Sequence, residues 1–339
     1  MNAKRYKTAI IGFGKIGAGY ADDTVMAKYF EYATHAQVLE KHPDFLWDAC
    51  VDPLPVARQM AKDRWGIAHA VASIGELPEG YQPDVVVVAT PPSDRDAVID
   101  AFPNAKAFML EKPLANSAAE GENLVRKCHS RGALVQVAFW RRADLGLRSL
   151  AEGGLEELIG KIQGISGIYG NGVRNCGIHM IDMVRMLAGE VKSAQALSGR
   201  MASCGPLKGD ADIAFHLNMI SGVPVSYIPI NFREYRENSI ELWGSAGRIS
   251  IYQEGLVARV YRKRPNRAMR GEGEVDGDVS ETIETFPGRA FYDLYSNLSE
   301  AIAGKSKLWS SGESALRSEA VLDAIWQSME NDGSRVDVA

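Results

Sequence analysis

The chain has 339 residues, which is too long for one ordinary core and suits two domains. A hydrophobic fraction of 46% and a charged fraction of 24% are normal for a globular protein that folds in water. The net charge of −5 gives no reason to expect nucleic acid or an anionic membrane surface as the main partner.

Neither secretion nor a metal site is expected. The amino-terminal apolar run is short and has no cleavage site of small residues, and no segment approaches the roughly 18 apolar residues of a membrane span. The cysteines form no C-x-x-C pair and the histidines show no metal spacing, so we expect no disulfide and no metal. A reducing cytoplasm is the expected location. The four cysteines are Cys50, Cys128, Cys176 and Cys204.

The first part of the chain alternates strand-like and helix-like segments. The β-branched run at 85–88 is typical of a strand that is buried on both faces of a parallel sheet. Strands and helices in alternation indicate βαβ units, so we predict a doubly wound parallel sheet over residues 1–142. The expected strands are 7–13, 43–52, 83–90, 105–113 and 133–142, and the expected helices are 55–66 and 117–132.

After about residue 142 the pattern changes. Several β-like runs follow with little helix between them, which indicates a mostly antiparallel sheet in a second α/β domain over residues 143–339. Residues 261–280 are poor in apolar residues and predict a mobile loop, whose basic side chains are either solvated or contact a diphosphate. The expected strands are 161–170, 194–200, 211–220, 223–230, 238–244, 247–252 and 256–261, and helices are expected near 143–152, from 176, near 290–303 and near 313–330.

Gly12, Gly14 and Gly17 form a G-x-G-x-x-G motif between the first strand and an expected helix. Without Cβ atoms the backbone can turn tightly and approach a pyrophosphate, which the N–H groups at the helix start then face. The second strand ends in Asp52, whose carboxylate would accept hydrogen bonds from the ribose hydroxyls of NAD and repel the 2′-phosphate of NADP. NAD is therefore the expected cofactor, and NADP is the less favoured one.

The interval between Gly17 and Asp52 is 35 residues, where about 20 are usual. The excess falls within residues 20–40. It is either a longer surface loop or an insertion beside the cofactor that contributes to a substrate pocket or lid.

Two further strand ends carry candidate site residues. Ligands of such sheets bind outside the carboxyl ends of the strands. A charged pair directly after an apolar strand is either a solvated exit or a site group, and a proline after a lysine biases that lysine to an extended backbone. The two strand ends read Thr90-Pro91-Pro92 and Glu111-Lys112-Pro113.

Taken in order, these motifs resemble those of the Gfo/Idh/MocA family, the glucose–fructose oxidoreductase and inositol dehydrogenase group. The matching elements are "GFGKIG", "VD" at the end of the second strand, "ATPP", "EKPL", the Arg-Arg pair of "FWRRAD", and "GIHMID". The resemblance covers nearly the whole chain. It implies an N-terminal Rossmann domain and a C-terminal α/β domain whose open sheet usually carries the subunit contacts of a homodimer or homotetramer.

The resemblance also implies roles for individual residues. Lys112 would contact the nicotinamide ribose side and the substrate hydroxyl, and His179 would be the general base. The family pattern has an aspartate four residues before this histidine, and this chain has Asn175 instead. That variant is common in relatives resembling oxidoreductases of surface-polysaccharide and nucleotide-sugar pathways, which favours that substrate class.

The residues around His179 support a site independently of the resemblance. Asn175 is a strongly preferred N-cap residue, so we predict a helix from Cys176 with His179 in its first turn. The positive end of that helix would keep the imidazole neutral and able to accept a proton. Asn175, His179 and Asp182 would share one helical face. Asn175 is either the cap or a residue that orients a substrate hydroxyl.

We therefore predict an NAD-dependent oxidoreductase that transfers hydride between nicotinamide and a secondary alcohol or ketone of a sugar, nucleotide sugar or cyclitol. The rivals are an NADPH-dependent ketosugar, cyclitol or imine reductase and a non-catalytic sugar-sensing regulator. The expected catalytic residues are Lys112, His179 and Asn175, and Arg142 joins them in binding substrate. The expected cofactor contacts are Gly12, Phe13, Gly14, Lys15, Ile16, Gly17, Asp52, Thr90, Pro91, Pro92, Glu111, Lys112, Trp140 and Arg141.

Overall fold

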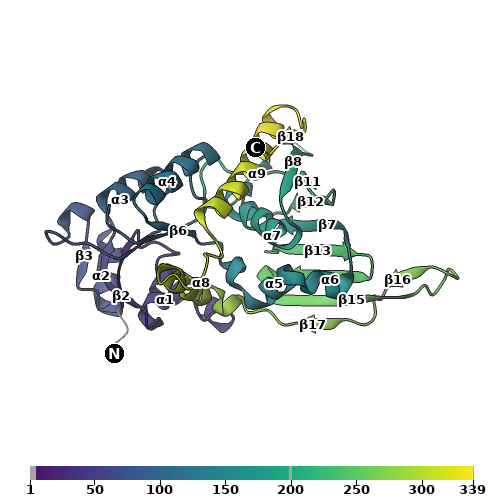
Figure 1. The fold of residues 1–339 in the computed structure, drawn as a ribbon, viewed down its shortest axis with the longest axis horizontal. Coiled ribbons are helices and arrows are strands. Elements are labelled where there is room, and N and C mark those ends of the chain that lie inside the picture. The colour runs from purple at the N-terminus through teal and green to yellow at the C-terminus, as the bar shows by residue number, and fades with distance from the viewer. Residues whose placement is uncertain (1–4, 198–200, 339) are drawn as a thin grey trace. The chain divides into compact units, whose positions relative to one another are not determined.

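The computed structural model describes residues 5–197 and 201–338, and the chain forms two compact units (Figure 1). The first unit contains the chain up to Ala143 together with Gly288–Leu316, and the second contains Asp144–Pro287 and the chain from Arg317 onward. The expected second domain, 143–339, is thus not one continuous stretch. The segment that returns to the first unit does so because its aromatic helix packs on the first domain, as described below.

The first unit is built on a parallel sheet. Within the described residues it has six strands in the order β3-β2-β1-β4-β5-β6, which confirms the predicted doubly wound sheet. The strands β4 and β5 are buried along their whole length, as their β-branched and apolar residues predict. The bounds are Tyr6–Ile11 (β1), Phe45–Val51 (β2), His69–Val71 (β3), Val85–Val88 (β4), Ala107–Leu110 (β5) and Leu134–Val137 (β6).

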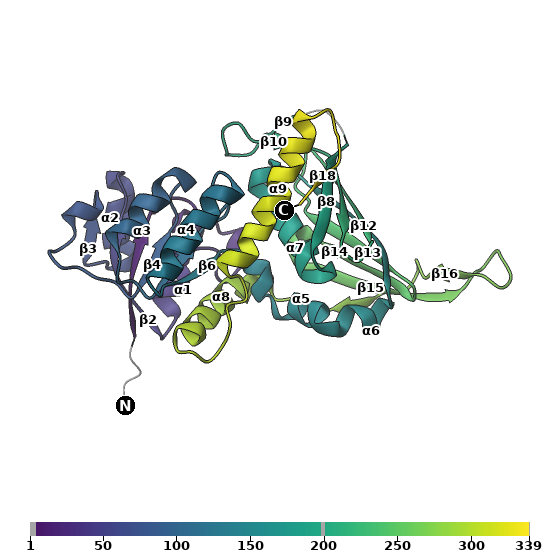
Figure 2. The ribbon, with the colours of Figure 1, turned by 45° about the horizontal axis from the view of Figure 1, so that its top comes forward.

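Helices cover both faces of this sheet. On one face the strand residues Ile10, Val87 and Met109 form a single buried cluster with side chains of α1, α2 and α8, among them Leu39 and Leu294. Helices α3 and α4 lie on the opposite face (Figures 1 and 2). The bounds are His35–Lys41 (α1), Pro55–Trp65 (α2), Arg95–Ala101 (α3), Ala118–Ser130 (α4) and Pro287–Ile302 (α8).

The second unit is built on a mixed, mostly antiparallel sheet, as predicted. Its order is β16-β15-β14-β13-β7-β12-β11-β8-β18, with β17 paired to β15, and within the described residues only β7 and β12 pair in parallel. The bounds are Ile162–Tyr169 (β7), Val191–Ala196 (β8), Phe215–Met219 (β11), Pro224–Pro229 (β12), Ser239–Gly244 (β13), Gly247–Tyr252 (β14), Val257–Pro265 (β15), Gly273–Val275 (β16), Glu281–Ile283 (β17) and Val336–Asp337 (β18). Residues 198–200 of the expected strand 194–200 lie outside the described residues.

Helices of the second unit pack on one face of this sheet (Figure 2). Residues alternate between the faces along β13, where Ile240 and Leu242 are buried and Trp243 is exposed. The helices are α5 (Leu145–Ser149), a π-helical turn (Leu150–Gly154), α6 (Leu155–Ile159), α7 (Ile178–Ala188) and the part of α9 (Gly312–Glu330) from Arg317 onward. Over the described residues, no helix combines the length and the apolar character that crossing a membrane requires.

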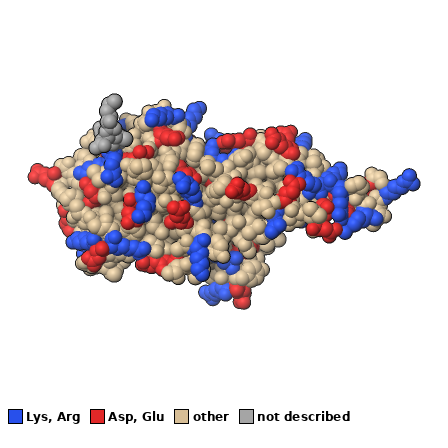
Figure 3. Space-filling model, turned by 90° about the horizontal axis from the view of Figure 1, so that it is seen from below, with Lys and Arg blue, Asp and Glu red and all other residues tan. Residues whose placement is uncertain are grey.

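The prediction of a loop over the whole of 261–280 is wrong, because residues 261–265 and 273–275 are strands and only 266–272 and 276–280 lie outside them. Strand β15 continues to Pro265 and pairs with β16 and β17, so these residues form a projecting β-arm (Figure 1). Arg264 contacts Glu274, Asp276 and Asp278, and Figure 3 shows acidic side chains among the basic ones on this arm. Backbone pairing between the strands orders the arm although it has few apolar residues. The ion pairs neutralise part of its positive charge, so less of that charge is available to bind a diphosphate.

Candidate functional site

The glycine motif forms a close-fitting turn at the carboxyl end of β1. Gly12 has a φ of +90°, and a Cβ on it would lie 2.8 Å from the carbonyl carbon of Ala89. A Cβ on Gly17 would lie 2.9 Å from the carbonyl oxygen of Gly12. A Cβ on Gly14 would meet nothing within 4 Å, so the chain leaves open space beside this residue. Close backbone packing therefore requires glycine at positions 12 and 17, and glycine at position 14 leaves the surface open for a ligand.

The helix expected after the glycine motif is interrupted. Its first turn forms, with the N–H of Ala18 bonded to the carbonyl of Gly14. The carbonyl of Lys15 still accepts from the N–H of Tyr20, five residues on, at 2.9 Å. The carbonyls of Ile16 and Gly17 then accept hydrogen bonds from the N–H groups of His35 and Ala36 at 3.2 and 2.9 Å. In an unbroken α-helix the donors would be residues 20 and 21.

Residues 20–34 are therefore an insertion into the first helix, and we refer to them as the insertion. His35 takes the place of residue 20, so the helix continues as α1 fifteen residues late. Removing these fifteen residues from the 35-residue interval between Gly17 and Asp52 leaves the usual spacing of about 20. The unusual spacing thus has a single structural cause.

The insertion packs within the first unit. The N–H of Tyr32 donates to the carbonyl of Gly288, and the Tyr32 ring lies 4.9 Å from that of Tyr292 in α8. Phe30 meets Trp140, a predicted cofactor contact, edge-on at 6.1 Å. Tyr29 is exposed although it is large and aromatic. The insertion is therefore an ordered element that lies beside predicted site residues.

Asp52 lies at the end of β2, where a ribose-binding carboxylate is expected. It is 6% exposed, and its two oxygens accept hydrogen bonds from the N–H groups of Phe13 and Leu54 at 2.7 and 2.8 Å. Each carboxylate oxygen can accept a second bond. Asp52 therefore braces the glycine turn and keeps acceptor capacity for a ligand.

Thr90 lies beside this turn at the end of β4. Its hydroxyl oxygen is buried and, among the described residues, has no hydrogen-bond partner. Behind it, the guanidinium of Arg95 donates to the carbonyls of Thr90, Pro113 and Leu114. Arg95 is almost fully buried and ties the ends of β4 and β5 together. Sequence reasoning missed Arg95, since an arginine in a helix gives no sign that it is buried.

Glu111 and Lys112 follow β5 directly. Glu111 is 9% exposed and its Oε1 lies 3.1 Å from Nε2 of His35, while Lys112 is half-buried. The Lys112–Pro113 peptide bond is cis. Sequence reasoning missed His35 because the insertion separates it from the glycine motif. Among the described residues no cluster of side chains could hold a metal ion.

These residues fit a dinucleotide. The close backbone at Gly12 and Gly17 and the open space at Gly14 form a cradle for a pyrophosphate, and the Thr90 hydroxyl offers an unused polar group at its rim. The glycine turn, Thr90 and Glu111 all lie at the carboxyl edge of the sheet, because β1, β4 and β5 are adjacent and parallel.

The junction segment after β6 carries the other predicted contacts. Trp140, Arg141 and Arg142 lie in a 3₁₀ turn, Trp140–Ala143. The guanidinium of Arg141 stacks 4.2 Å from the Trp140 ring and is buried. Arg142 is half-buried.

In the second unit, His179 lies on α7 and differs from its neighbours in burial. Every other residue from Ile178 to Arg185 is buried, while His179 is half-buried. Asp182, three residues later, bonds to Ser318 at 2.9 Å and to Arg185, so its carboxylate belongs to a buried network. His179 is thus partly accessible to solvent, and its role as a general base stays a prediction.

Of the two roles that the sequence leaves open for Asn175, the structure contradicts the helix cap. A π-helical turn, Val173–Gly177, precedes α7, so Asn175 is already helical and makes no side-chain cap. Its amide nitrogen instead lies 3.6 Å from the Cys176 sulfur. The helical segment begins at Val173, before the predicted start at Cys176. The residue that precedes it, Gly172, has a φ of 92°, a conformation that glycine adopts without strain.

The caps come from carboxylates further along the chain. Asp210 accepts hydrogen bonds from the N–H groups of Arg174 and Asn175, both at 3.0 Å, and Asp212 accepts from Gly172 at 2.7 Å. Burial raises the pKa of both carboxyl groups, and the hydrogen bonds oppose this shift. Nothing in the sequence indicates that residues 210 and 212 reach this helix end.

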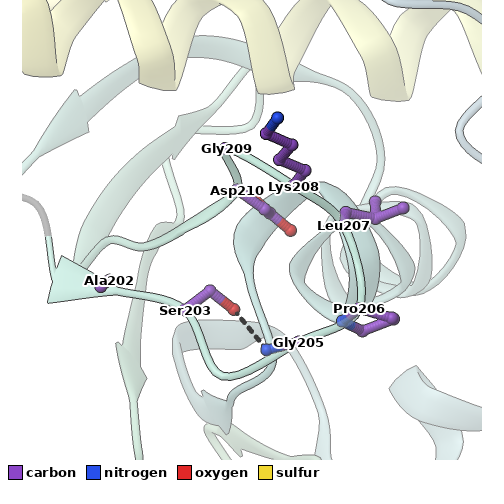
Figure 4. A pocket seen from close by; sticks show the side chains of 8 residues that line it. All are labelled: Ala202, Ser203, Gly205, Pro206, Leu207, Lys208, Gly209 and Asp210. Atoms are coloured by element: carbon purple, nitrogen blue, oxygen red, sulfur yellow. Dashed lines mark hydrogen bonds between the residues drawn. The ribbon is translucent and has the colours of Figure 1, made fainter.

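A hollow of about 550 Å³ on the loop 202–210 is lined in part by Asp210 (Figure 4). The Ser203 hydroxyl accepts from the N–H of Gly205 at 2.9 Å, and Lys208 is exposed. A Cβ on Gly205 would collide with the carbonyl of Asn171, so the loop lies tightly against the start of the helical segment that carries His179.

Two domain models of one protein family match the chain. The first, "Oxidoreductase family, NAD-binding Rossmann fold", matches residues 6–139, and the second, "Oxidoreductase family, C-terminal alpha/beta domain", matches residues 170–338. The chain belongs to the Gfo/Idh/MocA oxidoreductase family. The resemblance noted in the sequence is thereby confirmed, and the first unit is an NAD-binding Rossmann domain.

Curated Gfo/Idh/MocA relatives match part of the chain. Scyllo-inositol 2-dehydrogenase (NAD⁺) of Bacillus subtilis is 29% identical over 145 residues, 41% of this chain and 36% of the relative. Trans-1,2-dihydrobenzene-1,2-diol dehydrogenase of Mus musculus is 25% identical over 38% of this chain and 44% of its own. The rhizopine catabolism protein MocA of Rhizobium meliloti is 21% identical over 61% and 65%. The chain thus spans between a third and two thirds of the length of these relatives.

Solved structures share the fold over nearly the full length. An oxidoreductase from Agrobacterium radiobacter in complex with NAD⁺, L-tartaric acid and magnesium has a TM-score of 0.76 at 16% identity, covering 99% of both chains. The WlbA dehydrogenase from Bordetella pertussis in complex with NADH and UDP-GlcNAcA has a TM-score of 0.74 at 19% identity, again over 99% of both chains. At these identities the likeness concerns the fold.

Proposed function

We propose that this protein is an NAD-dependent oxidoreductase that transfers hydride between nicotinamide and a carbon bearing a hydroxyl or keto group, in a sugar, nucleotide sugar or cyclitol. The observation that carries the proposal is the edge of the first sheet, where the glycine cradle, the unused Thr90 hydroxyl and the Glu111-Lys112 pair lie on adjacent parallel strands. Family membership supplies the class of reaction.

The roles of the chain's residues follow from their chemistry. When bound, nicotinamide accepts a hydride from the carbon that carries the hydroxyl. A ring nitrogen of His179 takes the hydroxyl proton, and the Lys112 ammonium holds the same oxygen and stabilises the negative charge that develops on it. In the reverse direction His179 returns the proton. Asn175 orients a substrate hydroxyl, and Arg142 contacts the substrate.

The preference for NAD rests on Asp52. A buried carboxylate at the end of β2 repels a 2′-phosphate and can accept a ribose hydroxyl with its remaining lone pairs. Arg58 lies nearby, but its guanidinium donates to the carbonyls of Asp52 and Pro53. We therefore place NADPH second.

The proposed substrate class rests on the family resemblance, in which Asn175 is typical of relatives from surface-polysaccharide and nucleotide-sugar pathways. The hollow of the second unit is compatible with that class, and neither Asn175 nor His179 is among the residues that line it. A space of about 550 Å³ beside Ser203 and Lys208 suits a hydroxylated ring or a sugar with an anionic substituent. The scyllo-inositol and UDP-GlcNAcA in the names of the relatives bracket the range, from a plain cyclitol to a nucleotide sugar.

We also propose that the open face of the second sheet joins subunits of a homodimer or homotetramer. It exposes the large apolar side chains of Ile228 and Trp243. Light scattering of the purified protein tests this. A cytoplasmic location is the matching proposal, since among the described residues no disulfide is present.

The test is the reduction of NAD⁺ by the purified protein in the presence of a panel of cyclitols, sugars and nucleotide sugars, followed by the absorbance of reduced nicotinamide. Turnover with one class identifies the substrate. NADH and NADPH are titrated in parallel, and tighter binding of NADH is expected. NADH binding without turnover across the panel would instead favour the rival proposal of a sugar-sensing regulator.

A further inference from the structure

His35 is completely buried and hydrogen-bonded through both ring nitrogens. Nδ1 lies 2.6 Å from the hydroxyl of Tyr295, and Nε2 lies 3.1 Å from Oε1 of Glu111. All three residues belong to the first unit. The ring also packs 4.8 Å from that of Phe291.

The direction of these bonds follows from the partners. An ionised carboxylate can only accept, so Nε2 carries the proton and donates it to Glu111. In a neutral imidazole with its proton on Nε2, Nδ1 carries a lone pair, so it accepts from the Tyr295 hydroxyl, whose pKa burial holds well above its usual value. The result is a directed chain from Tyr295 through His35 to Glu111.

This chain ends at the predicted site. Glu111 directly precedes Lys112, and the bond from His35 is the one side-chain hydrogen bond that Glu111 makes among the described residues. A histidine needed only to fill space could be replaced by an apolar residue, which would avoid burying a polar ring. The two bonds from His35 instead fix where the carboxylate points.

The backbone of His35 holds the other side of the cofactor cradle. Its N–H donates to the carbonyl of Ile16, and the next N–H donates to that of Gly17. One residue therefore links the glycine turn to the strand end that carries Lys112. The insertion joins the helix immediately before this residue.

We propose that His35 is a positioning residue: by fixing Glu111 it sets the Lys112 backbone against the glycine turn. This inference rests on the proposed role of Lys112 at the reacting oxygen. The insertion ends directly before His35, so a change in its conformation would move His35 and, through Glu111, the backbone of Lys112.

Two amide variants, each of which replaces one ring nitrogen of His35, distinguish a positioning role from a packing role. In His35→Gln the side-chain amide can replace Nε2–H and still donate to Glu111, whereas in His35→Asn the shorter amide replaces Nδ1 and loses Glu111. The full chain is assayed for NADH affinity, for the fluorescence emission of bound NADH, for kcat and KM on the best substrate of the panel, and for thermal unfolding without ligand. Lys112→Met is the benchmark variant.

We expect His35→Asn to lower kcat about 10- to 100-fold with a smaller change in KM, since small misplacements of reacting groups have effects of this size. His35→Gln should stay within about threefold of the original protein, because it loses one neutral hydrogen bond. Both variants should unfold at similar, lowered temperatures. The bound-NADH emission of His35→Asn should move toward that of Lys112→Met.

Equal kcat and equal NADH emission in both variants, with only the unfolding temperature lowered, would overturn the proposal and leave His35 a packing residue. Failure of the proposed function is a separate result. In that case Lys112→Met itself leaves turnover and NADH emission unchanged, whatever the His35 variants do.

Discussion

The carboxylate of Asp210 accepts a hydrogen bond from the backbone N–H of Asn175, with Oδ2 3.0 Å from the nitrogen. The family resemblance expects a carboxylate on residue 175 itself, and this chain places one beside that residue from a distant segment. Asp210 is 6% exposed, and its carboxylate accepts hydrogen bonds from N–H groups at the start of the helical segment that leads to His179. This arrangement leads to two predictions.

The first prediction concerns pH and stability. Because burial raises the pKa of Asp210 above its unfolded value, its titration adds to the free energy of unfolding below the usual aspartate pKa, and this contribution is lost as the pH rises through the raised value. Asp210→Asn does not titrate, so the difference in unfolding temperature, original protein minus variant, should decrease over the pH range above the usual aspartate pKa. Thermal unfolding across this range measures it. A gap for Asp210→Asn that widens as the pH rises would refute the prediction.

The second prediction concerns Asn175. Asn175→Asp adds a like charge beside Asp210, which should lower the free energy of unfolding by on the order of 1–4 kcal/mol. The double variant Asn175→Asp/Asp210→Asn restores a single carboxylate and should recover most of that loss. Denaturant titration of the four proteins gives the coupling energy. Additive effects would show that residue 175 points away from Asp210.

A third prediction concerns the insertion. Deleting residues 20–34 joins Gly19 to His35 and lets the helix run unbroken, since His35 and Ala36 already bond to Ile16 and Gly17. The variant should fold and bind NADH within about threefold of the original, the size of a loop-length effect. Changes should appear in substrate KM and selectivity instead.

The control deletion is one residue shorter. Removing residues 21–34 leaves Tyr20 in the helix and turns His35 by about 100°. The imidazole then no longer reaches Glu111, so this variant should be less stable and bind NADH more weakly. Similar behaviour of the two deletions would mean that the register of the helix is irrelevant and that the insertion is an ordinary surface loop.

A fourth prediction concerns the choice of cofactor. Asp52→Ala removes the acceptor that holds the N–H of Phe13 at 2.7 Å, together with the charge that disfavours a 2′-phosphate. NADH binding should weaken by about 1–3 kcal/mol and the preference for NADH over NADPH should shrink. Isothermal titration with both dinucleotides decides. An unchanged ratio of the two affinities would remove Asp52 from cofactor selection.

Features that depend on residues close together in the sequence could be predicted, and features that depend on partners distant in the sequence could not. The parallel sheet and the glycine turn follow from local patterns, β-branched runs and glycine spacing, and the structure has both. The β-arm at 261–280 did not follow, because it forms by backbone pairing of β15 with β16 and by cross-strand contacts such as Arg264–Glu274, which a pattern of apolar residues does not register.

The site shows the same limit. The cap at Asn175 was mispredicted because the capping groups come from Asp210 and Asp212, more than thirty residues further along the chain. His35 was missed because the insertion hides its place in the helix. In each case the deciding partner is distant in sequence, and periodicity carries no information about such partners.

The most direct test of the account compares kcat for the original protein, Lys112→Met and His179→Ala, with the best substrate of the panel and saturating NAD⁺. His179→Ala should lower kcat by about 10²–10⁴, the range for loss of a general base, and still bind NADH normally. Lys112→Met should lower kcat by about 10²–10³, the range for loss of one group that stabilises developing negative charge. Full turnover in both variants on that substrate would contradict the account.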